Sequence, residues 1–367
     1  MGLKRKNDEK HEILLYACNE NQYNKAHEKV LCVKQIRKEQ KQMRTETIRL
    51  YEGREDVTLT TYLLDDSPEL LKGGARPAIV ICPGGAYLNC SDREAEPVAL
   101  RFAAMGYHAF VLRYSVYQEG CGGTPDWTKP IEPKLQCQYP KQMREMGMAM
   151  RLIKSKAEEW YVDPERITIC GFSAGAHNCA MYSVNWDQPV ITEYFSETAE
   201  IFRPAAVILG YPLTDYCYMK ESMKKDPMIG GLFSISNSAF LGMPDPGNEL
   251  LEEISPVYHV TEHVPPTFIW ATASDELVPV QHSLRMAYAL ADKKIPFEIH
   301  IFENGGHGLS LGDQTTAEAK TQINEDVQEW IIRAERWLKK RFAYDLPQIT
   351  EMEAMMQKFD SMRRNEV

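Results

Sequence analysis

The chain has 367 residues, of which 44% are hydrophobic and 26% are charged, and its formal net charge is −10. This composition is typical of a soluble protein with one large α/β domain or two smaller ones. The acidic balance argues against a general nucleic-acid binder, and no apolar stretch approaches the length of a membrane span. We therefore expect neither nucleic acid nor a membrane among its partners.

The nine cysteines are scattered along the chain, with no CxxC pair and no Cys/His cluster of the kind that binds a metal. We interpret them as reduced thiols in a reducing compartment. The first residues, MGLKRKNDEKHE, are charged and lead into no apolar segment, so we expect no signal peptide. Together these observations predict a cytoplasmic protein.

Residues 1–45 form a basic segment, with eleven Lys and Arg against six Asp and Glu, no Pro and one Gly. They show no strand alternation, and we expect a helical or frayed extension that the fold does not need. Met43 is an alternative natural start, because the codons AAG-GAG for Lys38-Glu39 would form a ribosome-binding sequence upstream of it. Mass spectrometry of the natural N-terminus would distinguish the two starts.

From residue 46 onward, strands alternate with helices. IRLYE and VTLTTYLL alternate with period two around a turn and predict an antiparallel hairpin. Short apolar runs then recur between helix-like stretches, as in a mainly parallel sheet that is covered on both faces. The predicted strands are PAIVIC (77–82), HAFVLRY (108–114), RITIC (166–170), PAAVILG (204–210), PTFIWAT (266–272) and PFEIHIF (296–302). The predicted helices cover 93–106, 143–161, about 281–293 and roughly 315–341.

Two segments interrupt this alternation. Residues 115–140 are rich in Gly and Pro, and residues 213–255 form another long excursion between strands. Connections of this length act as lids or binding loops, or are plain surface loops. The tail at 342–367 is rich in Met and predicts a short terminal helix, which either frays or packs against a second copy in a homo-oligomer. The main domain is accordingly predicted at 46–341.

The segment ITICGFSAGAHNCAM (167–181) places Ser173 between two glycines, where a predicted strand becomes a helix. A serine hydroxyl is a weak nucleophile that needs an adjacent base and donors for the oxyanion. A tight strand-to-helix turn presents the side chain at the carboxyl edge of the sheet, and Gly171 and Gly175 leave room for strand and helix to approach. The N–H of Ala174 begins the helix and points to where negative charge would develop.

The base and the acid that orients it are expected at later strand ends. Asp275 follows the strand PTFIWAT, and His307 lies in the glycine-rich loop NGGHG past the last strand. The order Ser173, Asp275, His307 is that of a known class of serine hydrolases. Asp275 would hold the imidazole in one tautomer, and His307 would take the serine proton and return it to the leaving group. Glu276 is the alternative acid.

The stretch ICPGGAYLNC (81–90) follows the strand PAIVIC. A Gly-Gly turn at a strand end can present backbone N–H groups to an oxyanion, although an ordinary glycine turn has the same sequence. Because Ser173 accompanies it, we expect Gly85 and Ala86 to donate together with Ala174. Removal of one such donor typically costs roughly 3–4 kcal/mol of transition-state stabilisation. Tyr87, just after the turn, is expected to line the mouth of the site.

Other residues fit a site less specifically. Trp127, in the first insertion, stacks either on a sugar ring or on the body of the protein. His177, one helical turn past the serine, is expected to be structural, because the role of base is already filled. His259 and His263 are four residues apart, but the following prolines shorten any helix and no third ligand is evident, so we expect no metal site.

The stretches PGGAY, REAEPVALRFAAMGYHAFVLRYS, DPERITICGFSAGAH, ASDELVPV and NGGHG are similar to those of the α/β-hydrolase esterase/lipase superfamily. In particular, the chain resembles acetyl xylan esterase-like and related bacterial carbohydrate esterases over about residues 46–341. Hormone-sensitive-lipase-like members carry His-Gly-Gly-Gly where this chain has Pro-Gly-Gly-Ala (83–86), a change that keeps the backbone donors. The resemblance implies an α/β-hydrolase fold with an eight-stranded sheet, helices on both faces and lid-like insertions. It also implies the triad Ser173, Asp275 and His307 and the oxyanion donors Gly85, Ala86 and Ala174.

The sequence therefore predicts a serine carboxylic-ester hydrolase that needs no metal or organic cofactor. The resemblance implies that it deacetylates oligosaccharides derived from xylan or mannan. Two alternatives stay open. One is a prolyl-oligopeptidase-like serine peptidase, which has the same chain order of triad residues. The other is a non-catalytic binding protein on a hydrolase scaffold, which normally goes with the loss of a triad residue.

Overall fold

The computed structural model describes residues 43–66, 69–70, 74–118 and 129–365. They belong to one unit of the chain, Met43–Val367. The extension predicted at 1–45 falls almost wholly outside the described residues, and Trp127 lies outside them as well.

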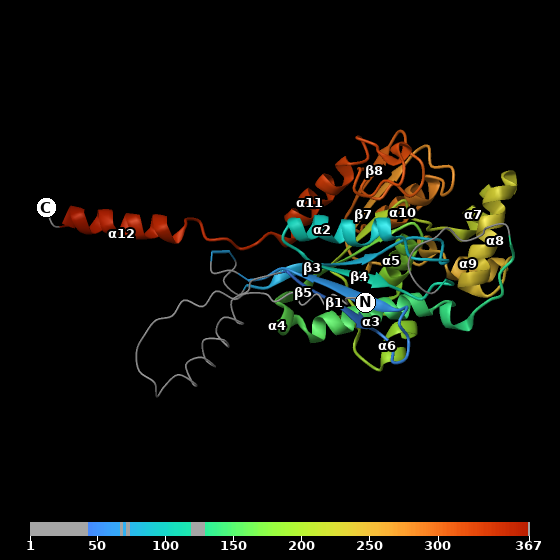
Figure 1. Ribbon diagram of the computed structural model, residues 1–367, viewed down its shortest axis with the longest axis horizontal. Helices are drawn as coiled ribbons and strands as arrows, with labels where there is room; N and C mark the ends of the chain where they lie inside the picture. Colours follow the sequence, from blue (N-terminus) through green and yellow to red (C-terminus); the bar gives the residue numbers. More distant parts are fainter. Residues whose placement is uncertain (1–42, 67–68, 71–73, 119–128, 366–367) are drawn as a thin grey trace, which may run out of the picture. The chain divides into compact units, whose positions relative to one another are not determined.

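An eight-stranded, mainly parallel sheet forms the centre of this unit, as predicted (Figure 1). The strand order is β1-β2-β4-β3-β5-β6-β7-β8. β1 pairs with β2, and β2 with β4, in antiparallel register, which confirms the predicted hairpin. The other neighbouring pairs are parallel. The strands are β1 (Arg44–Arg49), β2 (Thr58–Leu63), β3 (Arg76–Cys82), β4 (His108–Arg113), β5 (Val162–Phe172), β6 (Ala206–Gly210), β7 (Thr267–Thr272) and β8 (Phe297–Phe302).

Strand β3 contributes to two hydrophobic cores, because successive side chains of a strand point to opposite faces of the sheet. Ala78, Val80 and Cys82 belong to the core on one face, and Ile79 and Ile81 belong to the core on the other. All seven residues of β3 are buried. The run PAIVIC is thus a strand covered on both faces, as its continuous apolar character predicted.

Helices close both faces of the sheet. α2 and α11 pack on one face, and α3, α5 and α10 pack on the other. Figure 1 shows α2 and α11 on the opposite side of the sheet from α3. The helices are α2 (Glu96–Ala104), α3 (Lys141–Ser155), α4 (Ala157–Trp160), α5 (Ala174–Asn185), α6 (Pro189–Phe195), α7 (Tyr216–Ser222), α8 (Pro227–Leu241), α9 (Asn248–Glu253), α10 (Gln281–Asp292), α11 (Glu329–Phe342) and α12 (Glu351–Asn365).

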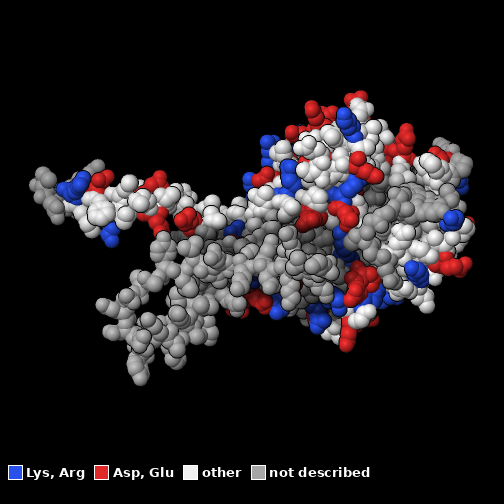
Figure 2. All heavy atoms as spheres, in the orientation of Figure 1, with Lys and Arg blue, Asp and Glu red and all other residues white. Residues whose placement is uncertain are grey.

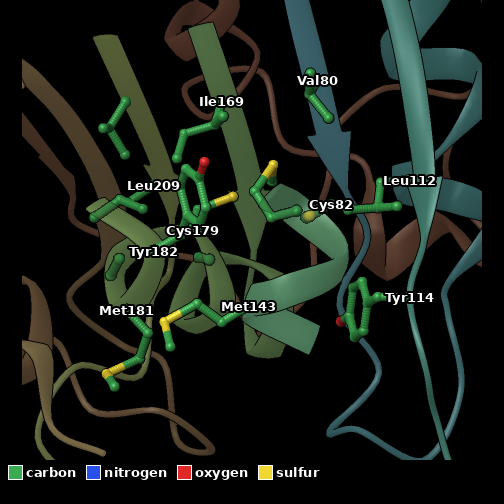
Figure 3. Close-up of a cluster of buried hydrophobic side chains, with 14 of the residues drawn as sticks. Val80, Cys82, Leu112, Tyr114, Met143, Ile169, Cys179, Met181, Tyr182 and Leu209 are labelled. Carbon is green, nitrogen blue, oxygen red and sulfur yellow. The ribbon is translucent and has the colours of Figure 1, made fainter. Parts of the chain in front are cut away.

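The larger core holds α5 against the strands. Figure 3 shows Cys179 and Tyr182 of α5 beside Ile169 of β5 and Leu209 of β6, with Met143 of α3 below them. All five side chains are buried. Burial of a large apolar side chain contributes about 1.5–3 kcal/mol. The turn that joins β5 to α5 is therefore fixed by packing on both of its sides.

The helix predicted at roughly 315–341 is wrong in its first half, because α11 begins at Glu329. The residues before it form turns and the short 3₁₀ helix η6 (Lys320–Gln322). The side chain of Asp313 accepts the N–H two residues on, at 2.9 Å, and that of Asn324 accepts the N–H three residues on, at 3.0 Å. Such local bonds compete with the backbone bonds of a helix.

The helix predicted at 93–106 is divided in two. Its first residues belong to the 3₁₀ helix η1 (Asp92–Glu94), and α2 starts at Glu96 with Pro97 in its first turn. Proline suits that place, because the first N–H groups of a helix have no partner within it. The stretch predicted at 143–161 is likewise two helices, α3 and α4.

The second insertion, 213–255, folds into α7, α8 and α9. The first insertion is described at 115–118 and 129–140, where it contains the 3₁₀ helix η2 (Leu135–Cys137). The tail forms the fifteen-residue helix α12, whose described side chains are all exposed. The expected terminal helix is therefore present, and it is longer than predicted.

Charges of both signs lie interspersed over the face of the molecule that Figure 2 shows. Within the described ranges, the helices all fall short of the length and apolar character that crossing a bilayer would require.

Candidate active site

Ser173 lies on the turn between β5 and α5. Its backbone has φ 50° and ψ −118°, a sparsely populated conformation that costs about 1–3 kcal/mol. The flanking glycines allow the turn: a Cβ on Gly171 would lie 2.2 Å from the carbonyl oxygen of Gly175. A Cβ on Gly175 would lie 2.1 Å from the carbonyl oxygen of Cys82. Strand and helix approach so closely that only glycine fits at both positions.

His307 joins Ser173 to Asp275 by two hydrogen bonds. Its Nδ1 lies 2.7 Å from Asp275 Oδ2, and its Nε2 lies 2.7 Å from Ser173 Oγ. Because a carboxylate oxygen only accepts, Nδ1 carries the proton and Nε2 accepts from the serine hydroxyl. The structure thus brings together three residues that follow the ends of β5, β7 and β8.

The carboxylate of Asp275 is held from two directions. Its second oxygen, Oδ1, accepts the N–H groups of Leu277 at 3.0 Å and Val278 at 2.9 Å, and its side chain is fully buried. Glu276, the alternative acid, is exposed. The geometry therefore favours Asp275 as the partner of His307.

The site also determines the pKa of His307. Burial works to lower the pKa, but the charge and hydrogen bond of Asp275, with a further contribution from the Glu94 carboxylate, raise it above the ordinary 6.5. The imidazolium form is thus stabilised where it would arise after proton transfer from serine.

The turn after β3 presents backbone N–H groups beside Ser173. Gly85, Ala86 and Tyr87 all have positive φ, at 133°, 54° and 59°. Ala86 and Ala174 line the cavity in front of the serine, whereas Gly85 does not. Among the described residues, the N–H groups of these two alanines have no backbone acceptor. These two residues are therefore the candidate donors to an oxygen atom in the cavity.

Tyr87 lies in the wall of the cavity, and the expectation that it lines the mouth is corrected. Its side chain is 1% exposed, and its ring stacks on Phe240 of α8 with centroids 3.9 Å apart. Its hydroxyl lies 2.5 Å from Nδ1 of His177, whose Nε2 donates to the carbonyl oxygen of Ile254 at 2.7 Å. Burial lowers the pKa of His177 to about 4. His177 is thus a neutral structural histidine, as expected.

An apolar cavity opens directly in front of Ser173, with about 60 Å³ of space for water-sized molecules. The second insertion supplies much of its wall, so this segment does shape the site. From α8, the Ser236 hydroxyl also donates to the carbonyl oxygen of Ala86 at 2.8 Å, which ties that helix to the turn after β3. The side chains that α7 and α8 contribute are Tyr216, Met219, Ile229, Leu232, Phe233 and Ser236.

Sequence reasoning missed a buried polar group next to these residues. Glu94 is 3% exposed and accepts the Gly84 N–H and the Tyr211 hydroxyl. In the sequence it looked like an ordinary acidic residue near a helix start, where acids are common. The local sequence carries no signal for this bonding, because the partners of Glu94 come from distant segments.

His259 and His263, which are four residues apart in the sequence, bond to separate partners. His259 Nε2 lies 2.9 Å from the carbonyl oxygen of Glu252, and His263 pairs with Asp187. In the ranges that the structure describes, no group of three or more His, Cys, Asp or Glu is placed to hold a metal ion.

Comparison with protein families and curated proteins gives the following matches. Residues 130–290 match the family model described as BD-FAE. The chain is 32% identical to endo-1,4-beta-xylanase B of Butyrivibrio fibrisolvens over 239 residues, which are 65% of this chain and 33% of that protein. The chain spans between a third and about half the length of the curated relatives that it matches.

Solved structures match over more of their length. MGS-M1, an alpha/beta hydrolase enzyme from a Medee basin deep-sea metagenome library, is 31% identical. The match covers 82% of this chain and 98% of that one, with a TM-score of 0.60. An acetyl ester-xyloside bifunctional hydrolase from Caldicellulosiruptor lactoaceticus is 28% identical, over 81% of this chain and 97% of the other, with a TM-score of 0.62.

Proposed function

The chain belongs to the esterase branch of the α/β-hydrolase superfamily, and from this premise we propose that it hydrolyses short-chain carboxylic esters through Ser173. The observation that carries the proposal is the 2.7 Å contact between Ser173 Oγ and His307 Nε2, with Asp275 behind the imidazole. A hydroxyl, an oriented base and a buried acid in this sequence form the arrangement that activates serine for attack.

The proposed reaction has two halves. The Ser173 oxygen attacks the ester carbonyl while its proton passes to His307 Nε2, and the N–H groups of Ala86 and Ala174 receive the oxyanion. The tetrahedral intermediate expels the alcohol, which takes the proton from the imidazolium. Water then attacks the acyl-serine with His307 again as base, releasing the carboxylic acid and restoring the enzyme.

The size of the cavity supports a short acyl group. A water molecule needs roughly 10–15 Å³ of such space, so the cavity in front of Ser173 has room for an acyl group of a few non-hydrogen atoms. An acetyl group fits this room, and its methyl suits the apolar walls. A peptide acyl chain, which the prolyl-oligopeptidase-like alternative requires, is much larger.

For the alcohol, we propose a sugar of an acetylated oligosaccharide derived from xylan or mannan. The names of the relatives support this choice, since they include a xylanase and an acetyl ester-xyloside bifunctional hydrolase. Release of acetate from acetylated xylo- and manno-oligosaccharides, followed by NMR, tests it directly.

The experiment on the nucleophile compares Ser173→Ala with the unchanged chain on nitrophenyl acetate. We expect at least about a thousandfold loss of kcat with an unchanged melting temperature. Ser196→Ala is the matched control, because Ser196 also has a positive φ, 54°, and is exposed at the end of α6. Retained turnover in Ser173→Ala would contradict the proposal.

Two further measurements separate the alternatives. Preferential cleavage of a proline-containing peptide amide over the acetyl ester would favour the peptidase. Failure of the unchanged protein to react with a fluorophosphonate probe would favour the non-catalytic binding protein.

A further inference from the structure

The short helix η1 lies between the two loops that carry the proposed oxyanion donors and the proposed base. On the side of the base, the Arg93 guanidinium donates to the carbonyl oxygen of Gly308 at 2.9 Å and also to that of Thr316. The Ser310 hydroxyl donates back to the carbonyl oxygen of Arg93 at 2.7 Å. The loop that follows His307 is thus tied to η1 by three hydrogen bonds.

On the other side of η1, Glu94 reaches the turn after β3. Its Oε2 accepts the Gly84 N–H at 2.6 Å, and its Oε1 accepts the Tyr211 hydroxyl at 2.5 Å. The Tyr211 oxygen in turn accepts the Ser310 N–H at 3.0 Å. One buried carboxylate therefore connects the oxyanion turn, the segment after β6 and the loop of His307.

The nucleophile lies immediately beside this connection. A Cβ on Gly84 would lie 2.8 Å from Glu94 Oε2 and 2.9 Å from Ser173 Cβ. The ring of Tyr211 packs against that of His307, with centroids 5.0 Å apart at an angle of 68°. A shift of the carboxylate would move its neighbours on both sides.

We propose that Glu94 is a positioning residue that holds the oxyanion turn and the His307 loop at their working separation, while its negative charge stabilises the imidazolium formed during the reaction. The inference rests on the proposed ester hydrolysis. Displacement by about 1 Å of a group that positions a reaction can cost on the order of a hundredfold in rate. Loss of the hydrogen bonds that Glu94 makes should therefore lower kcat.

The charge of Glu94 acts in a setting with few other charges. The titratable groups that face it are Tyr114 after β4, Cys170 of β5, Tyr211 after β6 and His307 after β8, with Arg93 beside it. Burial raises the pKa of both tyrosines and of the cysteine, so these three groups are neutral near pH 7. The Glu94 carboxylate is one cause of the raised pKa of His307, after Asp275.

Two substitutions separate position from charge. Glu94→Gln keeps the length of the side chain and removes the charge, and one amide cannot accept from both Gly84 N–H and the Tyr211 hydroxyl as the carboxylate does. Glu94→Asp keeps the charge and is one methylene too short to reach both partners. We expect kcat on nitrophenyl acetate to fall about tenfold to a hundredfold in both variants, with KM changed by less than about threefold.

The titration of His307, followed by NMR of its imidazole, gives a readout that needs no substrate. We expect the pKa of His307 to fall in Glu94→Gln and to stay near that of the unchanged protein in Glu94→Asp. If the unchanged protein hydrolyses no ester, the proposed function fails, yet this titration still decides the charge effect of Glu94. An unchanged titration in a folded Glu94→Gln variant would overturn the inference.

Glu145→Gln is the matched control. Glu145 is also buried, and it likewise accepts a backbone N–H, that of Ser115 at 2.7 Å, and the hydroxyl of the same residue. We expect this variant to lose stability without loss of kcat. An equal loss of kcat in the Glu94 and Glu145 variants would reduce Glu94 to a structural role and overturn the inference.

Tyr211→Phe carries the test if the Glu94 variants do not fold. It keeps the ring against His307 and removes only the oxygen that links Glu94 to the Ser310 N–H. We expect a fall in kcat of at least about fivefold with little change in KM, whereas an unchanged kcat would contradict the positioning role of Glu94.

Discussion

At the scale of single residues, the site depends on the direction in which each polar group is held. Asp275 has both carboxylate oxygens occupied, so it keeps the Nδ1 proton of His307 in place and leaves Nε2 free to accept from Ser173. The same logic applies to His177, where the carbonyl oxygen of Ile254 fixes the tautomer and leaves Nδ1 for Tyr87. His307 can therefore accept the serine proton, whereas His177 stays neutral.

The pH dependence of activity should report His307. Only the neutral imidazole accepts the serine proton, so kcat/KM should rise with pH through the pKa of His307, which lies above 6.5. Asp275→Asn removes the charge that raises this pKa, and we expect the rise to move to lower pH while kcat falls by about 10⁴-fold. Rate profiles between pH 5 and 9 measure both effects. An Asp275→Asn profile with an unmoved midpoint would show that Asp275 does not set the pKa.

At the scale of elements, α8 forms part of the wall of the cavity in front of Ser173. It begins where the Asp226 side chain accepts the N–H of Met228 at 2.9 Å, and it ends at Gly242 with φ 77°. Between these ends, Leu232 and Phe233 face the cavity. The acyl specificity of the enzyme should therefore depend on the side chains of this helix.

Shortening Leu232 should lengthen the preferred acyl chain. Leu232→Ala opens room in the wall, and a pocket discriminates one methylene by roughly 1–3 kcal/mol. We expect the ratio of kcat/KM for butyrate to that for acetate to rise at least about fivefold, measured with nitrophenyl esters. Leu241→Ala is the control, because Leu241 is on the same helix and does not line the cavity. A rise of the same size in the control would assign the effect to general loosening of the helix.

At the scale of the whole molecule, buried histidines link folding to pH. His108, His177 and His282 are 0% exposed, and burial lowers their pKa values to about 4, about 4 and about 3. Each is neutral when folded and takes up a proton on unfolding below pH 6.5. Their contribution to stability is complete above pH 6.5 and is lost as the pH falls toward 4.

Near pH 5.5 these three histidines lower the free energy of unfolding by roughly 3 kcal/mol per pH unit, since they take up about three protons. Burial raises the pKa of Glu145 to about 7, so unfolding releases about one proton from it, and we expect a net slope of roughly 2 kcal/mol per pH unit. Urea unfolding at pH 6.5 and 5.5 measures this slope. In His282→Asn, the new carbonyl oxygen can still accept the N–H groups of Thr214 and Asp215 that His282 Nδ1 accepts. The slope should then drop by roughly 1 kcal/mol per pH unit, and an unchanged slope would contradict the assignment for His282.

Local sequence determined those features of the protein that depend on neighbouring residues or on chain order. The hairpin, the buried strand PAIVIC and the tight turn around Ser173 follow from period, apolar runs and glycine spacing. The expected meeting of Asp275 and His307 with this serine followed from order alone, because parallel strands end at the same edge of a sheet.

Tertiary structure decided the features that depend on contacts between distant segments. The size of the cavity is set by α7 and α8 together with the turn after β3, and the sequence of the insertion does not encode that distance. Tyr87 lies in the cavity wall because its hydroxyl bonds to His177 and its ring stacks on Phe240. Glu94 became a link only when folding brought Gly84 and Tyr211 to its two oxygens, since a buried carboxylate bonds to whatever donors the packing supplies.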